Sequence, residues 1–184
     1  MDLNGWFQKG LTAEEYINSM TRNKEEMLSI YEGFAVRDED KNKLEPFREK
    51  QYRVIAISED WCGDALLNNA ILLKIAEAGG MEVRFILRDQ NLELIDQYLT
   101  NGTSRAIPIY IFIDQEGNEA GVWGPRAPQL QALVEKERGA LPDKGSADFE
   151  VKQKEMYKRL MTSYQQDAAI WQTVADSIII TLLK

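Results

Sequence analysis

Apolar positions in the middle of the chain alternate between strand-like and helix-like spacing. The run Tyr52–Ser58 is short and rich in β-branched residues, which is typical of a buried strand. After residue 62, apolar residues recur every three or four positions and predict a helix that ends at Gly79–Gly80. Met81–Leu87 then predicts a second strand. A strand, helix and strand of this length indicate a βαβ unit with a right-handed crossover and two parallel strands.

The pattern continues downstream with further elements of one domain. A helix is expected from about residue 92 to the turn Asn101–Gly102. Ile109–Ile113 and Glu119–Trp123 read as strands separated by a Gly-containing turn, so we expect an antiparallel hairpin. A last domain helix is expected over Pro128–Arg138.

Segments on both sides extend this central region. Thr12 and Glu15 have capping-box spacing, and the apolar residues after them predict one opening helix over Thr12–Tyr31. The charged segment Arg37–Lys50 contains Pro46 and has no clear period, so it is interpreted as an exposed linker. The resulting division is an N-terminal helix and linker (1–50), a core (51–140) and a C-terminal helical extension (141–184) within a single domain.

The C-terminal extension carries an apolar stripe that predicts one or two amphipathic helices. We favour packing of this stripe on the domain, against the opening helix; an oligomer or partner interface is the alternative. The stripe consists of Met156, Leu160, Tyr164, Ala168, Trp171, Val174, Ile178 and Leu182.

Composition narrows the function classes. Hydrophobic residues make up 44% of the 184 residues and charged residues 28%, as in ordinary globular proteins. The net charge is −8 and no basic block occurs, which disfavours nucleic acid as a partner. The start of the chain does not resemble a secretory signal, and no apolar run is long enough to span a membrane. We therefore expect a cytoplasmic protein without membrane partners.

The histidine and cysteine content restricts the chemistry further. The chain has no histidine, which removes Ser-His-Asp triads, Cys-His dyads and histidine metal ligands. With one cysteine, neither an intrachain disulfide nor a cysteine zinc site can form, and no metal or resident cofactor is expected. All thiol chemistry therefore rests on Cys62.

Cys62 lies at a predicted turn from strand to helix. A helix N-terminus stabilises a thiolate through its dipole and its unpaired N–H groups. In open α/β folds this turn lies at the carboxyl edge of the sheet, so we expect an exposed sulfur. The nearby carboxylates Glu59, Asp60 and Asp64 act in the opposite direction, because negative charge raises a thiol pKa. We expect these carboxylates to form a solvated rim rather than a cation site.

A resemblance to a known family rests on separate motifs. Trp61-Cys62-Gly63-Asp64 between a strand and a helix, followed by Ile107-Pro108 before a strand, resembles the thioredoxin superfamily over about residues 50–138. The chain is most similar to bacterial thioredoxin-like proteins with a Trp-Cys-Gly-Asp-Cys motif, which also resemble it at 104–108 and 123–126. The resemblance implies an α/β thioredoxin fold, with a central mixed β-sheet flanked by helices, here with an N-terminal helix and a C-terminal helical extension.

The resemblance also implies a site. In the superfamily the proline at position 108 is cis and faces the active cysteine, and the backbone before it pairs with substrate. Cys62 would then be the catalytic residue. Substrate would contact Trp61, Gly63 and Asp64 on one side and the shelf of Ile107 and Pro108 on the other.

Two departures from the family pattern change the expected mechanism. Ala65 occupies the position of the resolving cysteine, and Ala56 occupies that of a buried carboxylate in thioredoxin. Cys62 could still attack a disulfide and form a mixed disulfide, but release would need an external thiol such as glutathione. The expected partner is therefore a protein disulfide or a low-molecular-weight thiol. The alternative is a redox-inactive thioredoxin-fold binding or adaptor protein.

Another function class and several aromatic and basic residues are also considered as parts of a site. A one-cysteine peroxidase is disfavoured, because no threonine precedes Cys62 closely. Trp61 and Trp123 are candidates for shielding the sulfur, with packing as the alternative. Four arginines could attract an anionic thiol, although surface ion pairs are the favoured interpretation: Arg84, Arg88, Arg105 and Arg126.

Overall fold

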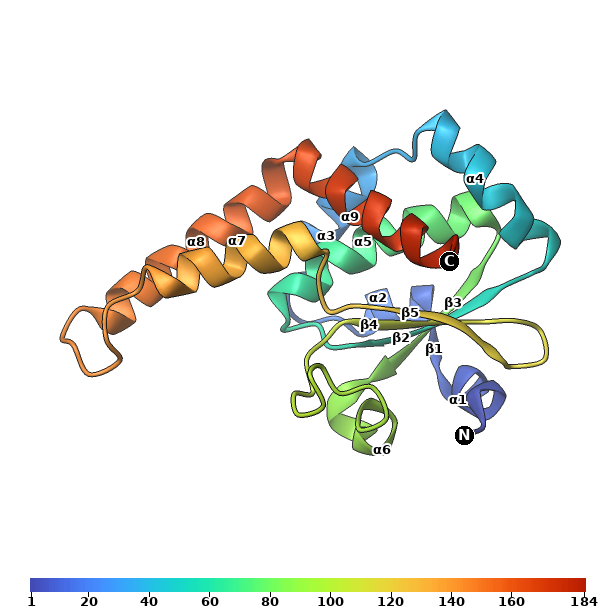
Figure 1. The fold of residues 1–184 in the computed structure, drawn as a ribbon, viewed down its shortest axis with the longest axis horizontal. Helices are drawn as coiled ribbons and strands as arrows, with labels where there is room; N and C mark the ends of the chain where they lie inside the picture. Colours follow the sequence, from blue (N-terminus) through green and yellow to red (C-terminus); the bar gives the residue numbers. More distant parts are fainter.

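A mixed five-stranded sheet with helices on both faces forms the centre of the molecule (Figure 1). The computed structural model describes residues 1–184. Strand order is β1-β3-β2-β4-β5; β2 and β3 are parallel, and the other neighbours are antiparallel. This is the expected thioredoxin fold. The strands are β1 (Leu11–Thr12), β2 (Arg53–Ser58), β3 (Glu82–Leu87), β4 (Ile109–Ile113) and β5 (Glu119–Trp123).

The predicted βαβ unit is confirmed and forms the middle of the fold. Its helix α5 (Gly63–Gly79) is buried along most of its length, because the sheet lies on one side and other helices lie on the other. Gly80 ends α5 with φ +62°, a left-handed conformation that favours glycine. The β4–β5 hairpin and the helix α7 (Pro128–Gly139) are also confirmed.

The prediction of one opening helix is wrong. The chain forms α1 (Leu3–Lys9), strand β1, α2 (Ala13–Ser19) and α3 (Lys24–Gly33), although the Thr12–Glu15 capping box is present. Between α2 and α3, the Asp60 carboxylate accepts hydrogen bonds from the backbone N–H groups of Thr21 and Arg22. This long-range contact holds the backbone out of helical geometry, which the local apolar pattern could not indicate.

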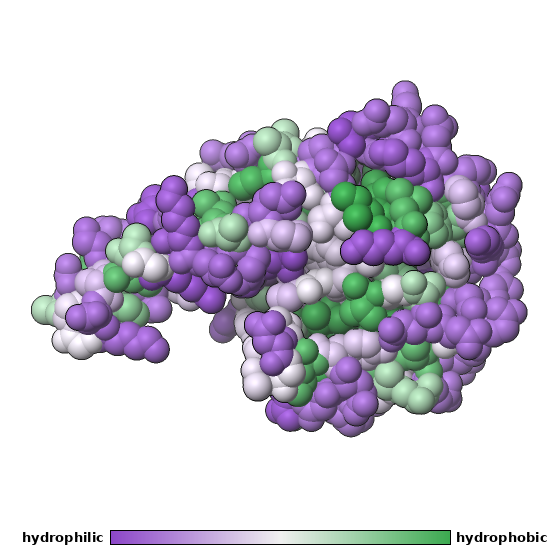
Figure 2. Space-filling view, in the orientation of Figure 1, coloured by the Kyte–Doolittle hydropathy of each residue, from purple (hydrophilic) through white to green (hydrophobic).

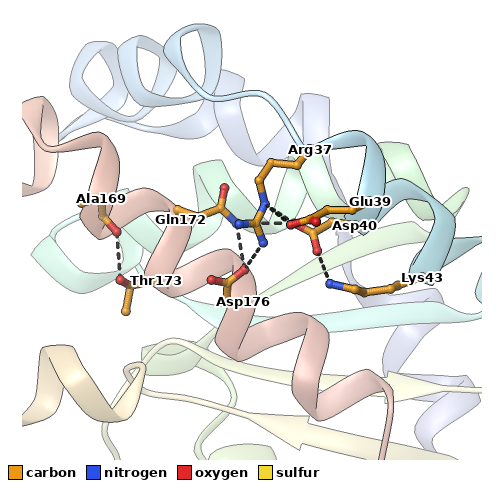
Figure 3. A network of polar contacts seen from close by, with 8 residues as sticks. All are labelled: Arg37, Glu39, Asp40, Lys43, Ala169, Gln172, Thr173 and Asp176. Carbon is orange, nitrogen blue, oxygen red and sulfur yellow. Dashed lines mark hydrogen bonds and ion pairs between the residues drawn. The ribbon is translucent and has the colours of Figure 1, made fainter.

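The predicted exposed linker is also wrong, because it contains helix α4 (Asp38–Glu49). Leu44 and Phe47 of α4 are buried, and α4 packs on α5. The Asp40 side chain, 2% exposed, binds Arg37 and Lys43 at 2.7 Å each (Figure 3). Tertiary packing and these ion pairs stabilise a helix that has a proline inside and a weak apolar period.

Two short elements replace the helix predicted after β3. A 3₁₀ turn, η1 (Arg88–Gln90), is followed by α6 (Leu92–Ile95), which covers only the start of the expected helix. Turns and an isolated bridge between Thr100 and Ser104 follow. The apolar residues after position 95 therefore belong to a loop.

The C-terminal extension forms two helices that pack within the chain, as favoured. Helix α8 (Phe149–Gln166) lies beside α7, and together they project from the body (Figure 1). Helix α9 (Ala168–Leu182) returns over α5 and β5. Arg37 binds Asp176 of α9 at 2.7 Å, so α4 and α9 are joined (Figure 3). The buried members of the stripe are Met156, Leu160, Tyr164, Val174 and Ile178.

The surface shows where apolar side chains remain uncovered. Figure 2 shows apolar areas over the end of α9 and over the adjacent sheet edge, whereas the projecting α7–α8 pair is mostly hydrophilic. The exposed apolar residues of β5 and of the end of α9 include Val122, Ile180 and Leu183. None of the helices is both long enough and apolar enough to cross a bilayer.

Candidate functional site

Cys62 occupies the N-cap position of α5, directly after β2. Its side chain is 9% exposed, so the expectation of an exposed sulfur is wrong. The thiol donates a hydrogen bond to the Ile107 carbonyl, with Sγ and O 3.6 Å apart. Cys62 therefore lies at the predicted turn, but as a covered group.

The Ile107–Pro108 segment lies beside Cys62, and its peptide bond is cis. A second loop approaches it closely: a Cβ built on Gly124 would lie 2.2 Å from the Pro108 carbonyl oxygen. Only glycine fits at this position, where φ is +133°. The Ile107 carbonyl, one of the expected substrate-pairing groups, already accepts the hydrogen bond of the thiol.

Helix α8 packs beside Cys62. A Cβ built on Gly63 would lie 2.7 Å from both Sδ and Cε of Met161, so α8 packs directly on the first turn of α5. Between them remains a cavity of about 450 Å³. It is lined by Asn23, Trp61, Cys62, Gly63, Asp64, Arg126, Val134, Arg138, Tyr157, Leu160, Met161 and Tyr164. Trp61, Cys62, Gly63 and Asp64 thus share one cavity, whereas Ile107 and Pro108 are not among its walls.

Asp64 ties three parts of the chain together beside the thiol. Its carboxylate binds the Arg126 guanidinium at 2.5 Å and accepts a hydrogen bond from the Tyr164 hydroxyl at 3.0 Å. The side chains of Asp64 and Arg126 are each 14% exposed. Asp64 is therefore a connecting group between α5, the β5–α7 loop and α8, not part of a solvated rim.

The other two carboxylates of the expected rim also have structural roles. Glu59 is buried and accepts a hydrogen bond from the Asp89 backbone N–H; burial raises its pKa. Burial acts to raise the pKa of Asp60, but hydrogen bonds from Thr21 and Arg22 outweigh it and hold that pKa below its usual value. No three Asp, Glu or Cys side chains gather closely enough to hold a metal ion.

The electrostatic surroundings of Cys62 favour the thiol over the thiolate. Burial, followed by the Asp64 charge, raises the pKa of Cys62 to about 11. Backbone N–H groups of Ala65 and Asp64 and the Arg126 charge act in the opposite direction, as a helix N-terminus should. The helix terminus is present, but burial dominates.

The two positions that depart from the family pattern are filled by apolar and neutral polar packing. Ala65 is buried in the same apolar cluster as Cys62. Ala56 is buried and pairs with Tyr110 across β2 and β4. The Tyr110 hydroxyl donates to Asn69 Oδ1 at 2.8 Å, and Asn69 donates to Ser58 at 2.9 Å. A buried network without charge therefore adjoins the strand position of the missing carboxylate.

Of the aromatic and basic candidates, only Trp61 and Arg126 line the cavity beside Cys62. Trp61, 42% exposed, lines the cavity and lies under the Arg88 guanidinium, whereas Trp123 is buried against Tyr110 away from it. The favoured interpretation of surface ion pairs holds for Arg84 with Glu82, Arg88 with Asp89 and Arg105 with Asp96. Only Arg126 of the four lines the cavity.

Sequence reasoning missed the walls contributed by α7 and α8. Tyr157, Met161 and Arg138 lie far from Cys62 in sequence, and no motif connects them with it. The apolar stripe identified Leu160 and Tyr164 as buried, but it could not indicate which surface they cover.

Comparisons with solved structures show the fold. The chain is similar to the crystal structure of a protein of unknown function from Pseudomonas aeruginosa, with a TM-score of 0.68 and 18% identity, over 98% of this chain and 97% of that chain. It is also similar to the crystal structure of an HIV epitope-scaffold, with a TM-score of 0.67 and 18% identity, over 98% of both chains. None of the curated proteins matches.

Family membership rests on the sequence match. A family model described as thioredoxin matches residues 10–138. This region runs from just before β1 to the last turn of α7 and contains both Cys62 and Pro108. The chain therefore belongs to the thioredoxin family.

Proposed function

We propose that the protein is a single-cysteine member of the thioredoxin family that captures the sulfur of a partner on Cys62 as a mixed disulfide. The main support for this proposal is the position of Cys62. It lies at the first turn of α5 and on the wall of a cavity large enough for a small molecule. Cys62 is the only cysteine, so it is the only group there that can form a disulfide.

The proposed capture step balances with one disulfide as co-reactant. The Cys62 thiolate attacks a disulfide R–S–S–R′, a new Cys62–S–S–R bond forms, and R′–S⁻ leaves and takes up a proton. Ala65 supplies no second thiol, so an external thiolate must attack the mixed disulfide and release Cys62. Low-molecular-weight thiols such as glutathione provide this step in a reducing compartment, which agrees with a cytoplasmic location.

The raised pKa of Cys62 limits the rate of the capture step. With a pKa of about 11, only about one molecule in several thousand carries a thiolate near pH 7.5. Capture is therefore slow while the sulfur is buried, and uncovering of the sulfur accelerates it. Loss of burial would remove the largest contribution to the raised pKa.

A second function is favoured by the same burial. A thioredoxin-fold binding protein would hold its ligand in the cavity and keep Cys62 as a packed, protonated thiol. The missing cysteine at position 65 and the neutral network near Ala56 agree with such a protein.

The test is reaction of the purified protein with neutral dithiodipyridine across pH, with mass analysis of the product. Capture predicts one adduct on Cys62, a rate that increases with pH, and release by glutathione. Cys62→Ser is the matched control and forms no adduct. Failure of the unmodified protein to form the adduct, together with full partner binding by Cys62→Ser, would refute capture in favour of the binding protein.

A further inference from the structure

The cavity beside Cys62 combines an apolar wall with a small charged set. Tyr157, Leu160 and Met161 of α8 line it together with Trp61, and Trp61 and Tyr157 are among the exposed aromatic residues of the chain. Its volume of about 450 Å³ is within the usual range of small-molecule sites. The charged residues on its walls are Asp64, Arg126 and Arg138.

These three charges leave a net positive cavity. Asp64 and Arg126 neutralise each other as an ion pair. Arg138 forms no ion pair and no side-chain hydrogen bond; its neighbour Glu137 binds Arg159, and Glu135 accepts a hydrogen bond from Gln131. The chain as a whole carries −8, so the positive charge at this cavity is a local feature. An unpaired guanidinium at the rim of a cavity is suited to a carboxylate.

Two contacts that are already present at the site disfavour the binding of an extended polypeptide. The Ile107 carbonyl, which would pair with a substrate strand, already binds the thiol, and α8 packs on Gly63. A small molecule in the cavity would leave both contacts in place, because the cavity lies beside them.

We infer that the partner of Cys62 is a small disulfide that carries a carboxylate, with Arg138 as the residue that binds this carboxylate. The apolar part of the molecule lies between Trp61 and Tyr157. This inference rests on the proposed capture step and adds its substrate class, because the charge at Arg138 selects among disulfides that Cys62 could attack.

The experiment compares three disulfides of different charge: dithiobisnitrobenzoate (anionic), dithiodipyridine (neutral) and cystamine (cationic). Rates with the protein are divided by the rates with free cysteine to remove intrinsic reactivity. The expected result is a preference for the anionic over the cationic disulfide of about threefold to tenfold at low salt. Arg138→Gln should abolish this preference. Lys136→Gln, which removes a charge from the same helix outside the cavity wall, should retain it.

A second measurement separates the carboxylate site from the sulfur chemistry. Cys62→Ser is titrated with glutathione and with glutathione diethyl ester, in which the carboxylates are masked. Stronger binding of glutathione, lost in Cys62→Ser/Arg138→Gln, supports the inference. Equal normalised rates for the three disulfides overturn it but leave the capture step intact. If none of the three forms an adduct, the capture step fails, and equal binding of glutathione and its ester then overturns the carboxylate site as well.

Discussion

The Tyr164 hydroxyl on α8 donates a hydrogen bond to the Asp64 carboxylate, only two residues after Cys62 and 100 residues before Tyr164 itself. The same carboxylate binds Arg126. The Asp64 side chain therefore anchors the C-terminal extension to the first turn of α5. The contact brings α8 next to the residue whose charge contributes to the raised pKa of Cys62.

Replacement of Tyr164 by phenylalanine should loosen this anchor. A hydrogen bond to a charged group contributes about 1.5–3 kcal/mol, and Arg126 still compensates the carboxylate in the variant, so we expect a loss of about 1–2 kcal/mol in the free energy of unfolding. The rate of Cys62 labelling should increase severalfold. Denaturant unfolding and thiol labelling measure both effects. Tyr52→Phe is the matched control, because Tyr52 lies outside the cavity wall and its hydroxyl forms no hydrogen bond; equal effects of the two variants would contradict the anchor.

A methyl group on Gly63 should displace the Met161 side chain of α8. In Gly63→Ala the new Cβ would meet Met161 at 2.7 Å, so the Met161 side chain must move. We expect faster labelling of Cys62 than in the unmodified protein. Gly145→Ala serves as the control because a Cβ there meets nothing within 4 Å. Unchanged labelling in Gly63→Ala would show that Met161 does not restrict access to the sulfur.

The raised thiol pKa predicts a pH dependence of stability. Burial raises the pKa of Cys62 to about 11 from an ordinary value of 9.0, so the unfolded chain loses this proton first as the pH rises. The stabilisation from the protonated thiol is complete below about pH 8.5 and is lost as the pH rises towards 11. The stability difference between the unmodified protein and Cys62→Ala should fall by about 2–3 kcal/mol over this range. The two unfolding curves are measured across pH, and a constant difference would contradict the raised pKa.

Restoring the family's second cysteine should restore an internal disulfide. Ala65 lies one helical turn after Cys62 and shares its apolar cluster. In Ala65→Cys a mild oxidant should produce an intramolecular disulfide, detected as the loss of one thiol pair in a labelling assay and reversed by dithiothreitol. Cys62→Ser/Ala65→Cys is the control and cannot close the bond. Persistence of both free thiols under oxidant would indicate that the turn no longer permits the family geometry.

The Asp40 network should contribute measurably to stability. Its buried carboxylate is bound by Arg37 and Lys43, and Arg37 continues to Asp176 on α9 (Figure 3). Asp40→Asn should lower the free energy of unfolding by about 1–2 kcal/mol, since the buried side chain loses its charge-assisted hydrogen bonds to Arg37 and Lys43. Asp38→Asn, at an ion pair whose carboxylate is 96% exposed, should change it far less, because solvent screens this pair. Thermal or denaturant unfolding compares the two.

Local sequence patterns determined the elements that carry the family site. The β-branched run of β2, the helix stop at Gly80 and the hairpin β4–β5 are each encoded within a few residues, so spacing and residue type were sufficient. The position of Cys62 at the start of α5 and the absence of a partner thiol were likewise evident from the sequence. These features depend on short-range geometry, which apolar periodicity reports directly.

Long-range contacts determined the helices before β2 and the protonation state of Cys62. The break between α2 and α3 depends on Asp60, and helix α4 depends on packing against α5, although neither has a local signal. The chemical state of Cys62 was undecided in the sequence, because a helix terminus and nearby carboxylates act in opposite directions. Burial acts in the same direction as the Asp64 charge and outweighs the helix terminus. The residues that bury the thiol, such as Ile107, are distant in sequence and are brought to it only by the tertiary fold.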